Sequence, residues 1–118
     1  MYSHAATIIP VNDIRDSIDF YVGKLGFQCT FEWEEPATYA VLNFNDKINI
    51  HLSKMDEPVQ LRDQTIIYIF VHDVDSVYKS LITMQVAIQN PPKTWDYGMR
   101  DFDILDNTGH RLSFGMGV

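Results

Sequence analysis

Polar side chains alternate with apolar ones in the run INIHLS, which begins at Ile48. Because successive side chains of a strand point to opposite faces, Asn49 and His51 share one face and the apolar residues share the other. The imidazole of His51 can hydrogen-bond a ligand or titrate near neutral pH. The alternative is a structural histidine paired with a neighbour such as Asn49, and the sequence leaves both interpretations open.

A second set of alternating polar residues lies near the end of the chain. Asp101 and Asp103 flank one apolar residue, and Arg111 and Ser113 flank another, so each pair is expected on one face of its strand. Two carboxylates on one face repel each other unless a cation compensates their charge. The acidic pair therefore indicates either a cationic ligand or an ion pair with Arg100 or Arg111.

Two aromatic residues, Trp95 and Tyr97, lie in a polar segment that follows Pro91-Pro92. The segment has no apolar period that would place them in a core, so they are interpreted as exposed residues that contact a ligand. A dimer contact and a lid over the protein's own core are the alternatives. Together with the acidic pair, these rings would suit a planar or cationic ligand.

The elements that position these residues occur twice. An apolar strand leads through Asp13 into one amphipathic segment, and a similar strand leads through Asp73 into another. Each aspartate predicts a helix start, because its carboxylate can accept hydrogen bonds from the unpaired N–H groups of the first turn. Gly26 is expected to end the first helix. The predicted buried helix faces consist of Ile14, Ile18, Tyr21, Val22 and Leu25, and of Val74, Val77, Tyr78, Leu81 and Ile82.

Strands complete each half as a βαβββ module, which predicts an α+β fold. Strands are expected at 5–11, 27–33, 39–44, 48–53, 66–71, 86–90, 99–105 and 110–116. Pro91-Pro92 is expected to break the chain after the sixth strand. Module one spans about residues 4–54 and module two about 65–117, within a single domain of residues 1–118.

Composition excludes several classes of function. The 118 residues carry a formal net charge of −7 at pH 7, and no element concentrates Lys or Arg, which argues against a nucleic-acid partner. No apolar run is long enough to span a bilayer, and no secretory leader is recognised. Cys29 is the only cysteine and cannot form an intrachain disulfide. A cytoplasmic protein without a membrane partner is expected.

Other residues with reactive or aromatic side chains are assigned structural places. Three histidines are expected to be solvated, at a strand start, before a helix cap and beside a turn, namely His4, His72 and His110. Cys29, Phe31 and Trp33 alternate along one strand and are assigned to the core or to a dimer interface, whereas Glu32 is assigned to the polar face. Cys29 is therefore not expected to act as a nucleophile.

Three runs of the sequence carry a family resemblance. PVNDIRDSIDFYVGKLGF, INIHLS and DYGMRDFDILDNTGHRLSF together resemble the vicinal-oxygen-chelate superfamily of glyoxalases, extradiol dioxygenases and antibiotic-resistance proteins. The resemblance spans nearly the whole chain. It implies two βαβββ modules whose eight strands form a curved, cup-like mixed sheet with helices on its outer face, usually within a homodimer. The polar strand faces would line the cup.

Metal-dependent proteins of this superfamily hold a divalent cation with His or Glu at four strand positions. The positions that the resemblance assigns to these ligands are Ala6, His51, Ile66 and Ser113. Alanine and isoleucine have no donor atom, and a serine hydroxyl is a weak neutral ligand, so no metal site and no cofactor are predicted. A displaced site that uses His4 or Asp103 is the alternative.

The pattern without metal ligands looks most like the bleomycin-resistance branch of the superfamily. It predicts a homodimer that sequesters a planar or cationic small molecule, as in antibiotic resistance. The alternatives are a metal-dependent enzyme of glyoxalase or dioxygenase type with displaced ligands, and a scaffold whose cup is filled by its own side chains. The residues predicted to bind the ligand are Asn49, His51, Tyr68, Trp95, Tyr97, Asp101, Asp103, Arg111 and Ser113.

Overall fold

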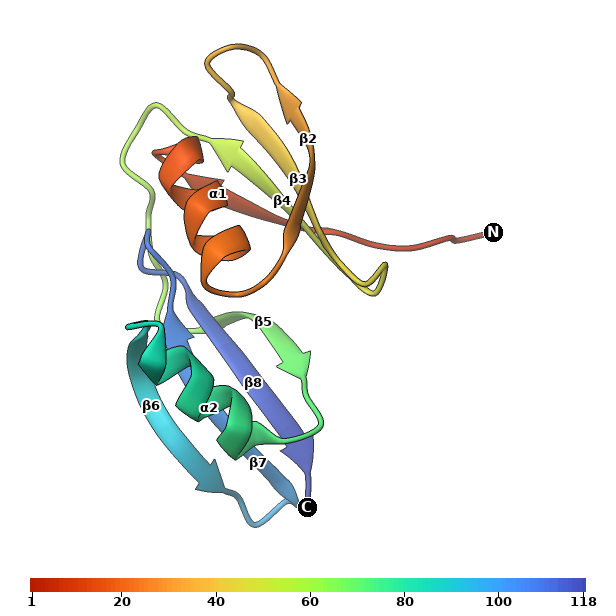
Figure 1. Ribbon diagram of the computed structural model, residues 1–118, viewed down its shortest axis with the longest axis vertical. Helices are drawn as coiled ribbons and strands as arrows, with labels where there is room; N and C mark the ends of the chain where they lie inside the picture. Colours follow the sequence, from red (N-terminus) through yellow and green to blue (C-terminus); the bar gives the residue numbers. More distant parts are fainter. The chain divides into compact units, whose positions relative to one another are not determined.

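Two four-stranded sheets, each packed against one helix, make up the computed structural model, which describes residues 1–118. The chain divides into two compact units, Met1–Gln60 and Leu61–Val118, and each unit has the element order βαβββ (Figure 1). The predicted α+β fold of two βαβββ modules is confirmed, with the eight strands arranged in two mixed sheets.

The elements follow one another in the same order in both units. The first unit contains β1 Thr7–Val11, α1 Ile14–Gly23, β2 Gln28–Trp33, β3 Tyr39–Phe44 and β4 Ile48–Lys54. The second unit contains β5 Thr65–Phe70, α2 Val74–Thr83, β6 Ala87–Thr94, β7 Met99–Leu105 and β8 Arg111–Gly117. The sheet orders are β1-β4-β3-β2 and β5-β8-β7-β6, and in each sheet only the first pair is parallel.

Both helices begin where the sequence predicts. The side chain of Asp13 accepts a hydrogen bond from the backbone N–H of Asp16 at 3.0 Å, and Asp73 accepts one from Ser76 at 3.1 Å. These bonds satisfy N–H groups that have no partner within the helix. The helices have 10 residues each, and neither is long and apolar enough to cross a membrane.

Alternation along β4 places its apolar side chains in the core of the first unit. Ile50 and Leu52 are 0% exposed, whereas His51 between them is partly exposed on the other face. The predicted register of this strand is therefore confirmed. Ile50 and Leu52 pair with Leu42 and Ala40 of β3, and these two residues are also fully buried, so one sheet face supplies the core beneath α1.

One residue at the edge of each predicted helix face is exposed. Val22 and Ile82, which the apolar pattern assigned to the buried faces, are 38% and 48% exposed. Each lies eight residues after the first helical residue, about 80° around the helix axis from it, at the margin of the stripe that contacts a sheet. Ser17 and Phe20 are buried on α1 instead.

A β-bulge in β2 changes which side chains share a face. Cys29 pairs with Leu42 of β3 and Phe31 pairs with the next residue, Val41, so β2 carries one extra residue at this point. Cys29 and Phe31 consequently lie on opposite faces, and the prediction that they share one is wrong. Glu32 likewise lies on the helix side, where Arg15 of α1 binds it at 2.5 Å, and not on the polar face.

Strand β6 continues through the two prolines that were expected to break it. It runs from Ala87 to Thr94 and pairs only with β7, with register irregularities on both sides of Asn90. An edge strand tolerates proline, because one side of the strand has no ladder hydrogen bonds to donate. The irregular register accommodates Pro91-Pro92 and brings Lys93 opposite Asp101 of β7.

The turn before β8 buries a histidine that was expected to be solvated. The Asp106 Oδ1 atom accepts hydrogen bonds from the backbone N–H groups of Thr108, Gly109 and His110 at 3.0, 2.9 and 2.9 Å. The turn therefore closes around the carboxylate, and His110 is only 5% exposed. The other two histidines of this group, His4 and His72, are exposed as predicted.

Candidate functional site

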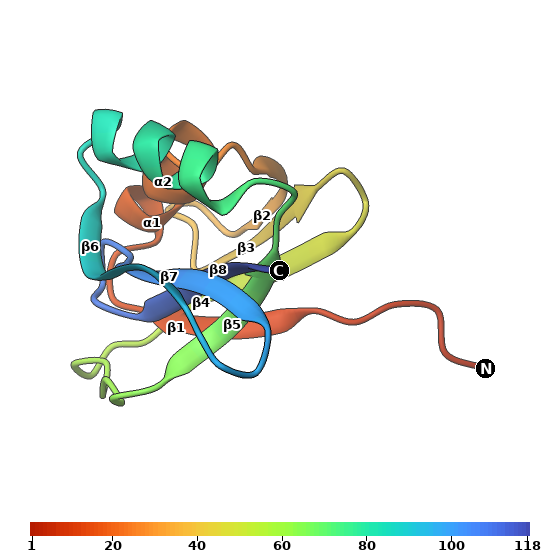
Figure 2. The ribbon, with the colours of Figure 1, turned by 90° about the horizontal axis from the view of Figure 1, so that it is seen from below.

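The face of the second sheet that α2 does not cover carries most of the predicted ligand-binding residues. Tyr78 of α2 packs edge-on against Phe102 of β7, with ring centroids 5.3 Å apart, so Phe102 lies on the helix side. Figure 2 shows α2 on one side of the strands of the second sheet. Asp101 and Asp103 flank Phe102 in β7 and therefore lie on the opposite face of this sheet. We call this opposite surface the open face. Its residues, given by the strand register, are Tyr68, Phe70, Asn90, Lys93, Asp101, Asp103, Arg111, Ser113 and Gly115.

Asp101 is held between two aromatic side chains. Its Oδ1 atom accepts a hydrogen bond from the Trp95 indole Nε1 at 2.8 Å, and its Oδ2 atom accepts one from the Tyr68 hydroxyl at 2.9 Å. Trp95 in turn stacks on Tyr97, with ring centroids 6.0 Å apart and planes 10° apart. The predicted residues Tyr68, Trp95, Tyr97 and Asp101 thus meet in one group, which we call the aromatic–carboxylate cluster.

The Tyr68 phenol is kept neutral by its surroundings. Burial raises the pKa of Tyr68 to about 12, and the hydrogen bond to Asp101 and the charge of that carboxylate add to the rise. Gly115 makes this position of the phenol possible, because a Cβ atom at residue 115 would lie 1.8 Å from the Tyr68 hydroxyl oxygen. Tyr68 is therefore a hydrogen-bond donor to Asp101 throughout the neutral pH range.

Asp103 is held by a second chain of neutral donors. Its Oδ1 atom accepts a hydrogen bond from the Ser113 hydroxyl at 2.5 Å, and its Oδ2 atom accepts one from Asn90 at 2.7 Å. Ser113, which is 3% exposed, also shares a hydrogen bond with the Thr65 hydroxyl at 2.6 Å. Both carboxylates of the acidic pair are therefore positioned by uncharged groups.

Neither arginine named as a possible counter-ion binds the acidic pair. Arg100 donates to Asp75 of α2 at 2.9 and 3.1 Å on the helix side, and Arg111 donates to Asp63 at 3.1 Å. The ion-pair interpretation of the acidic pair is therefore wrong. The Arg111 Nε atom is buried without a hydrogen-bond partner, so this guanidinium is only partly satisfied by the protein.

His51 lies on the face of the first sheet that α1 does not cover, as the alternation predicts. Its Nδ1 atom and the Tyr39 hydroxyl are 2.7 Å apart, and the two rings meet edge to face at 5.4 Å. Asn49, the partner that the sequence suggested, instead bonds to Asn43 at 2.8 Å and to the backbone oxygen of Ala5 at 3.1 Å. The histidine is therefore paired with a neighbour, but the neighbour is a tyrosine on β3.

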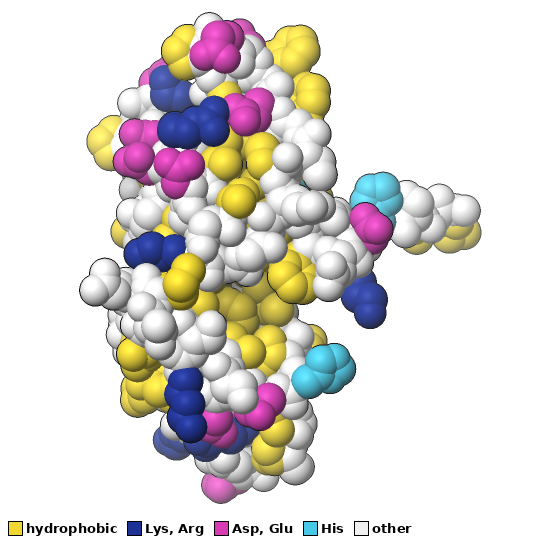
Figure 3. Space-filling view, in the orientation of Figure 1, with side chains coloured by type: hydrophobic (Ala, Val, Ile, Leu, Met, Phe, Trp, Pro, Cys, Tyr) yellow, Lys and Arg dark blue, Asp and Glu magenta, His cyan; other side chains and the backbone are white.

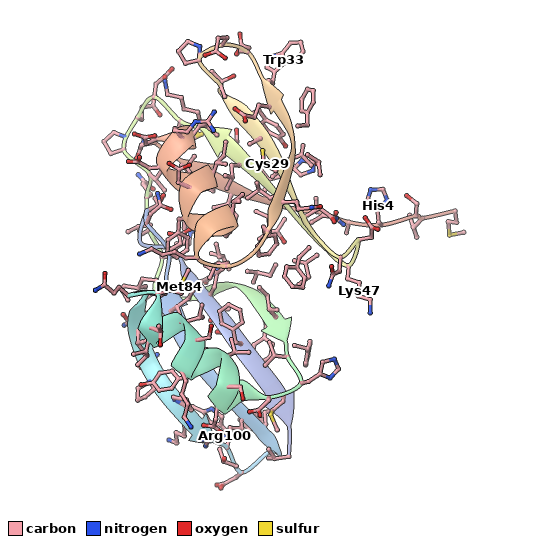
Figure 4. All side chains as sticks on the ribbon, in the orientation of Figure 1. His4, Cys29, Trp33, Lys47, Met84 and Arg100 are labelled. Atoms are coloured by element: carbon pink, nitrogen blue, oxygen red, sulfur yellow. The ribbon has the colours of Figure 1, made fainter.

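The same face of the first sheet exposes a second aromatic pair. Phe31 and Trp33 are 50% and 58% exposed and stack with ring centroids 6.3 Å apart, so neither belongs to the core of its unit. Trp33 lies near the end of β2 (Figure 4). No carboxylate bonds to the indole N–H of Trp33, which distinguishes it from Trp95. A substitution of Trp33 can therefore serve as the control for a substitution of Trp95.

Several residues of the site were missed by the sequence analysis. They are Tyr39, Thr65, Asn90, Lys93 and Gly115. All except Gly115, which has no side chain, contact the predicted residues through strand register, and alternation within one strand does not specify its neighbours. The turn at Asn45-Asp46 was the one available signal, because it fixes β3 against β4 and so places Tyr39 diagonally from His51.

The residues at the four superfamily metal positions do not fit a metal. In the first unit, Ala6 has no donor and the Nδ1 atom of His51 is engaged with Tyr39. In the second, Ile66 has no donor and Ser113 donates to Asp103. Nowhere do three or more His, Cys, Asp or Glu side chains come together in a way that could hold a metal ion.

Two further residues that could bind a metal or react, His4 and Cys29, do not create a metal site on the polar faces. His4 lies on the extended N-terminal segment and hydrogen-bonds to Ser3 at 2.9 Å (Figure 4). Cys29 lies on the helix side of β2, and burial raises the pKa of its thiol, which keeps it protonated and weakly nucleophilic. Neither residue therefore adds a metal ligand or a reactive group to the polar faces.

A cleft of about 320 Å³ opens in the first unit beside the start of α1. Its charged lining includes Arg15, Glu35 and Lys54, and Arg15 is already paired with Glu32. None of the predicted ligand-binding residues lines it. On the face shown in Figure 3, Lys and Arg side chains lie among Asp and Glu side chains.

Comparison with solved structures places this architecture among known folds. A crystal structure of a glyoxalase/bleomycin resistance protein/dioxygenase superfamily protein from Sphaerobacter thermophilus matches with a TM-score of 0.81 and 22% identity, covering 98% of each chain. TioX from Micromonospora sp. ML1 matches with a TM-score of 0.82 and 18% identity, covering 99% of this chain and 100% of TioX. These identities are low, so the matches establish a shared fold.

A protein with a stated resistance role has the same fold. The fosfomycin resistance protein FosX from Listeria monocytogenes matches with a TM-score of 0.79 and 12% identity, covering 100% of this chain and 95% of FosX. No curated protein matches the sequence. The model of the Glyoxalase/Bleomycin resistance protein/Dioxygenase superfamily matches residues 2–114, which is nearly the whole chain. The chain therefore belongs to the glyoxalase/bleomycin resistance protein/dioxygenase superfamily.

Proposed function

We propose that the open face of the second sheet binds a planar, cationic small molecule without a metal. The observation that carries this proposal is the Asp101 carboxylate, which bonds to Trp95 and Tyr68 and forms no ion pair. Its negative charge is oriented by neutral donors, and no arginine or lysine forms an ion pair with it. A bound cation would supply the missing charge, since an opposite charge nearby stabilises an ionised carboxylate.

The aromatic rings supply the second half of the recognition. Trp95 and Tyr97 are 38% and 72% exposed and nearly parallel, so they offer a flat apolar surface beside the carboxylate. A cation placed over an aromatic face gains about 0.5–2 kcal/mol, and a flat ring also removes apolar area from water. The cluster is therefore suited to a ligand that combines an aromatic plane with a positive charge.

We infer that the ligand is sequestered and not transformed, as in the bleomycin-resistance branch. The open face carries no activated nucleophile, because the Ser113 hydroxyl is buried and already donates to Asp103. A glyoxalase- or dioxygenase-type reaction would need metal ligands that neither polar face supplies. One structural neighbour is named as a fosfomycin resistance protein, and a role in antibiotic resistance is proposed here by analogy with it.

A matched pair of tryptophan substitutions tests the proposal. The probe is N-methylacridinium, a flat fluorescent cation, and its uncharged analogue acridone serves as the neutral control; bleomycin-type glycopeptides extend the screen. Trp95→Leu should weaken binding of the cation by about two- to thirtyfold. Trp33→Leu removes a stacked indole that is more exposed than Trp95 and has no carboxylate partner, and it should leave the affinity unchanged.

The charge is tested separately at constant ionic strength, because exposed charges are screened by salt. Asp103→Asn and Asp101→Asn should each weaken binding of the cation more than binding of acridone. Asp56→Asn removes the same charge from an exposed segment of the first unit and should have little effect. Binding of anionic compounds alone would contradict the proposal and would direct attention to the unsatisfied guanidinium of Arg111.

A further inference from the structure

Lys93 occupies an unusual position in the cluster. It lies opposite Asp101 in the β6–β7 register, yet no ion pair joins the two side chains. The Lys93 ammonium instead lies 4.0 Å from the centroid of the Trp95 ring. The protein's own cation therefore occupies an aromatic face in the region where the ligand is expected.

The hydrogen bonds of Asp101 explain why the indole attracts this ammonium. The carboxylate accepts the Trp95 N–H at 2.8 Å, and such a bond polarises the indole and increases the electron density of its ring. A more negative ring face binds a cation more strongly. Asp101 therefore favours placement of the ammonium over the Trp95 ring without forming an ion pair with it. Trp33, whose N–H has no carboxylate partner, has no cation over its ring.

The contact between the Lys93 ammonium and the Trp95 ring can break and re-form. Lys93 is exposed, its ammonium is held by one ring, and no hydrogen bond fixes it. An ammonium that leaves the ring returns to water, where it is well solvated. Tyr97 and Phe70, 72% and 74% exposed, leave apolar area available on the same unit for a flat molecule once Lys93 has moved.

Resting on the proposed function, we propose that Lys93 is the built-in occupant of a cation site on Trp95, which the charged group of the ligand takes by displacing it. The ligand class follows from this exchange. It carries an ammonium or another delocalised organic cation beside an aromatic plane, since only a cation regains the interaction that Lys93 gives up. A ligand must therefore bind the Trp95 ring more strongly than Lys93 does, and this requirement excludes weakly bound neutral compounds.

The first test needs no ligand. In a ¹H–¹³C spectrum of lysine-labelled protein, the ε-methylene of Lys93 should be shifted upfield by the indole ring current. Trp95→Leu should abolish this shift and leave the ε-methylene of Lys47, in the first unit, unchanged. A Lys93 signal at the position of a solvated lysine would overturn the assigned occupancy.

The second test measures the competition. Lys93→Met should bind N-methylacridinium about two- to thirtyfold more tightly than the parent protein. Lys47→Met, which removes a positive charge elsewhere, should bind like the parent. The gain from Lys93→Met should vanish in the Trp95→Leu background, because the competition requires the indole. An equal gain in both backgrounds would show general charge repulsion and overturn the proposal.

The two proposals fail in different ways. Binding by the parent that Lys93→Met leaves unchanged or weakens would overturn the displacement and leave the proposed function standing. Absence of binding by every variant would refute the proposed function. If no variant binds and the Lys93 signal is nevertheless shifted upfield, Lys93 and Trp95 form a permanent internal pair. That result would also overturn the proposed displacement of Lys93 by a ligand.

Discussion

Tyr68 and Gly115 show how one missing side chain fixes the geometry of the open face. The Tyr68 hydroxyl occupies the space that a Cβ atom of residue 115 would take. This close approach lets the phenol cross β8 and donate to Asp101 of β7 at 2.9 Å. Because the Asp101 carboxylate is thereby oriented before any ligand arrives, Gly115 contributes to the site without contacting a ligand.

Gly115→Ala is expected to break this arrangement. The added methyl group must displace the Tyr68 ring, so the pKa of Tyr68 should fall from about 12 toward that of an ordinary tyrosine. Overpacking of this kind should also lower the free energy of unfolding by about 1–3 kcal/mol. Titration of ¹³Cζ-labelled tyrosine by NMR and urea denaturation measure the two effects.

Gly117→Ala is the matched control, because a Cβ atom there meets nothing within 4 Å. It should leave the pKa of Tyr68 unchanged and alter stability by no more than about 0.5 kcal/mol. An unchanged Tyr68 titration in Gly115→Ala would show that the phenol does not depend on the missing side chain.

The pH dependence of Tyr68 gives a second prediction at this scale. A raised pKa means that the folded state favours the neutral phenol, so its contribution to stability is fully present below pH 10 and is lost as the pH rises to about 12. Asp101→Asn removes the neighbouring negative charge and should lower the pKa of Tyr68. The pKa should stay above 10, because burial remains. A pKa that did not move would contradict the Tyr68–Asp101 contact.

At the scale of elements, strand β4 separates a structural residue from a candidate binding residue. Ile50 is fully buried under α1, whereas the neighbouring His51 lies on the opposite face. Ile50→Ala should lower the free energy of unfolding by about 2–5 kcal/mol, as large-to-small core substitutions do. His51→Ala removes mainly the contact with Tyr39 and should cost much less. Equal losses in denaturation experiments would be inconsistent with this register.

The type of each element, and the face of the sheet on which each strand residue lies, were predictable here because both depend on the pattern of neighbouring residues. The Asp13 and Asp73 caps fixed both helix starts, and alternation placed Asp101, Asp103 and Ser113 on one face. The prediction of which side chains share a face was wrong in β2, because the bulge near Cys29 reverses the faces of the residues after it. Alternation assumes an uninterrupted strand, and one inserted residue inverts every assignment beyond it.

The contacts that assemble the site depend on pairing between strands. Lys93 reaches the ring of Trp95 only because β6 continues past Pro91-Pro92 as an edge strand, which the proline pair alone argues against. The burial of His110 depends on the turn closing around Asp106. Such long-range or turn-specific contacts are not encoded in the apolar period of a single element.

At the scale of the whole molecule, we propose a homodimer, as the superfamily resemblance implies. The edge strands β1, β2, β5 and β6 each pair on one side only, and exposed edges invite pairing with another chain. Light scattering at micromolar concentration should give the mass of two chains. A monomer mass would contradict the proposal. A cytoplasmic location stays a prediction.

A flat cation is proposed to bind the aromatic–carboxylate cluster of the second unit. The two tryptophans of the chain give two indole N–H signals in a ¹⁵N NMR spectrum. Saturating N-methylacridinium should shift the Trp95 signal and leave the Trp33 signal in place. A shift of Trp33 alone, or of neither indole at concentrations where the ligand binds, would contradict the account.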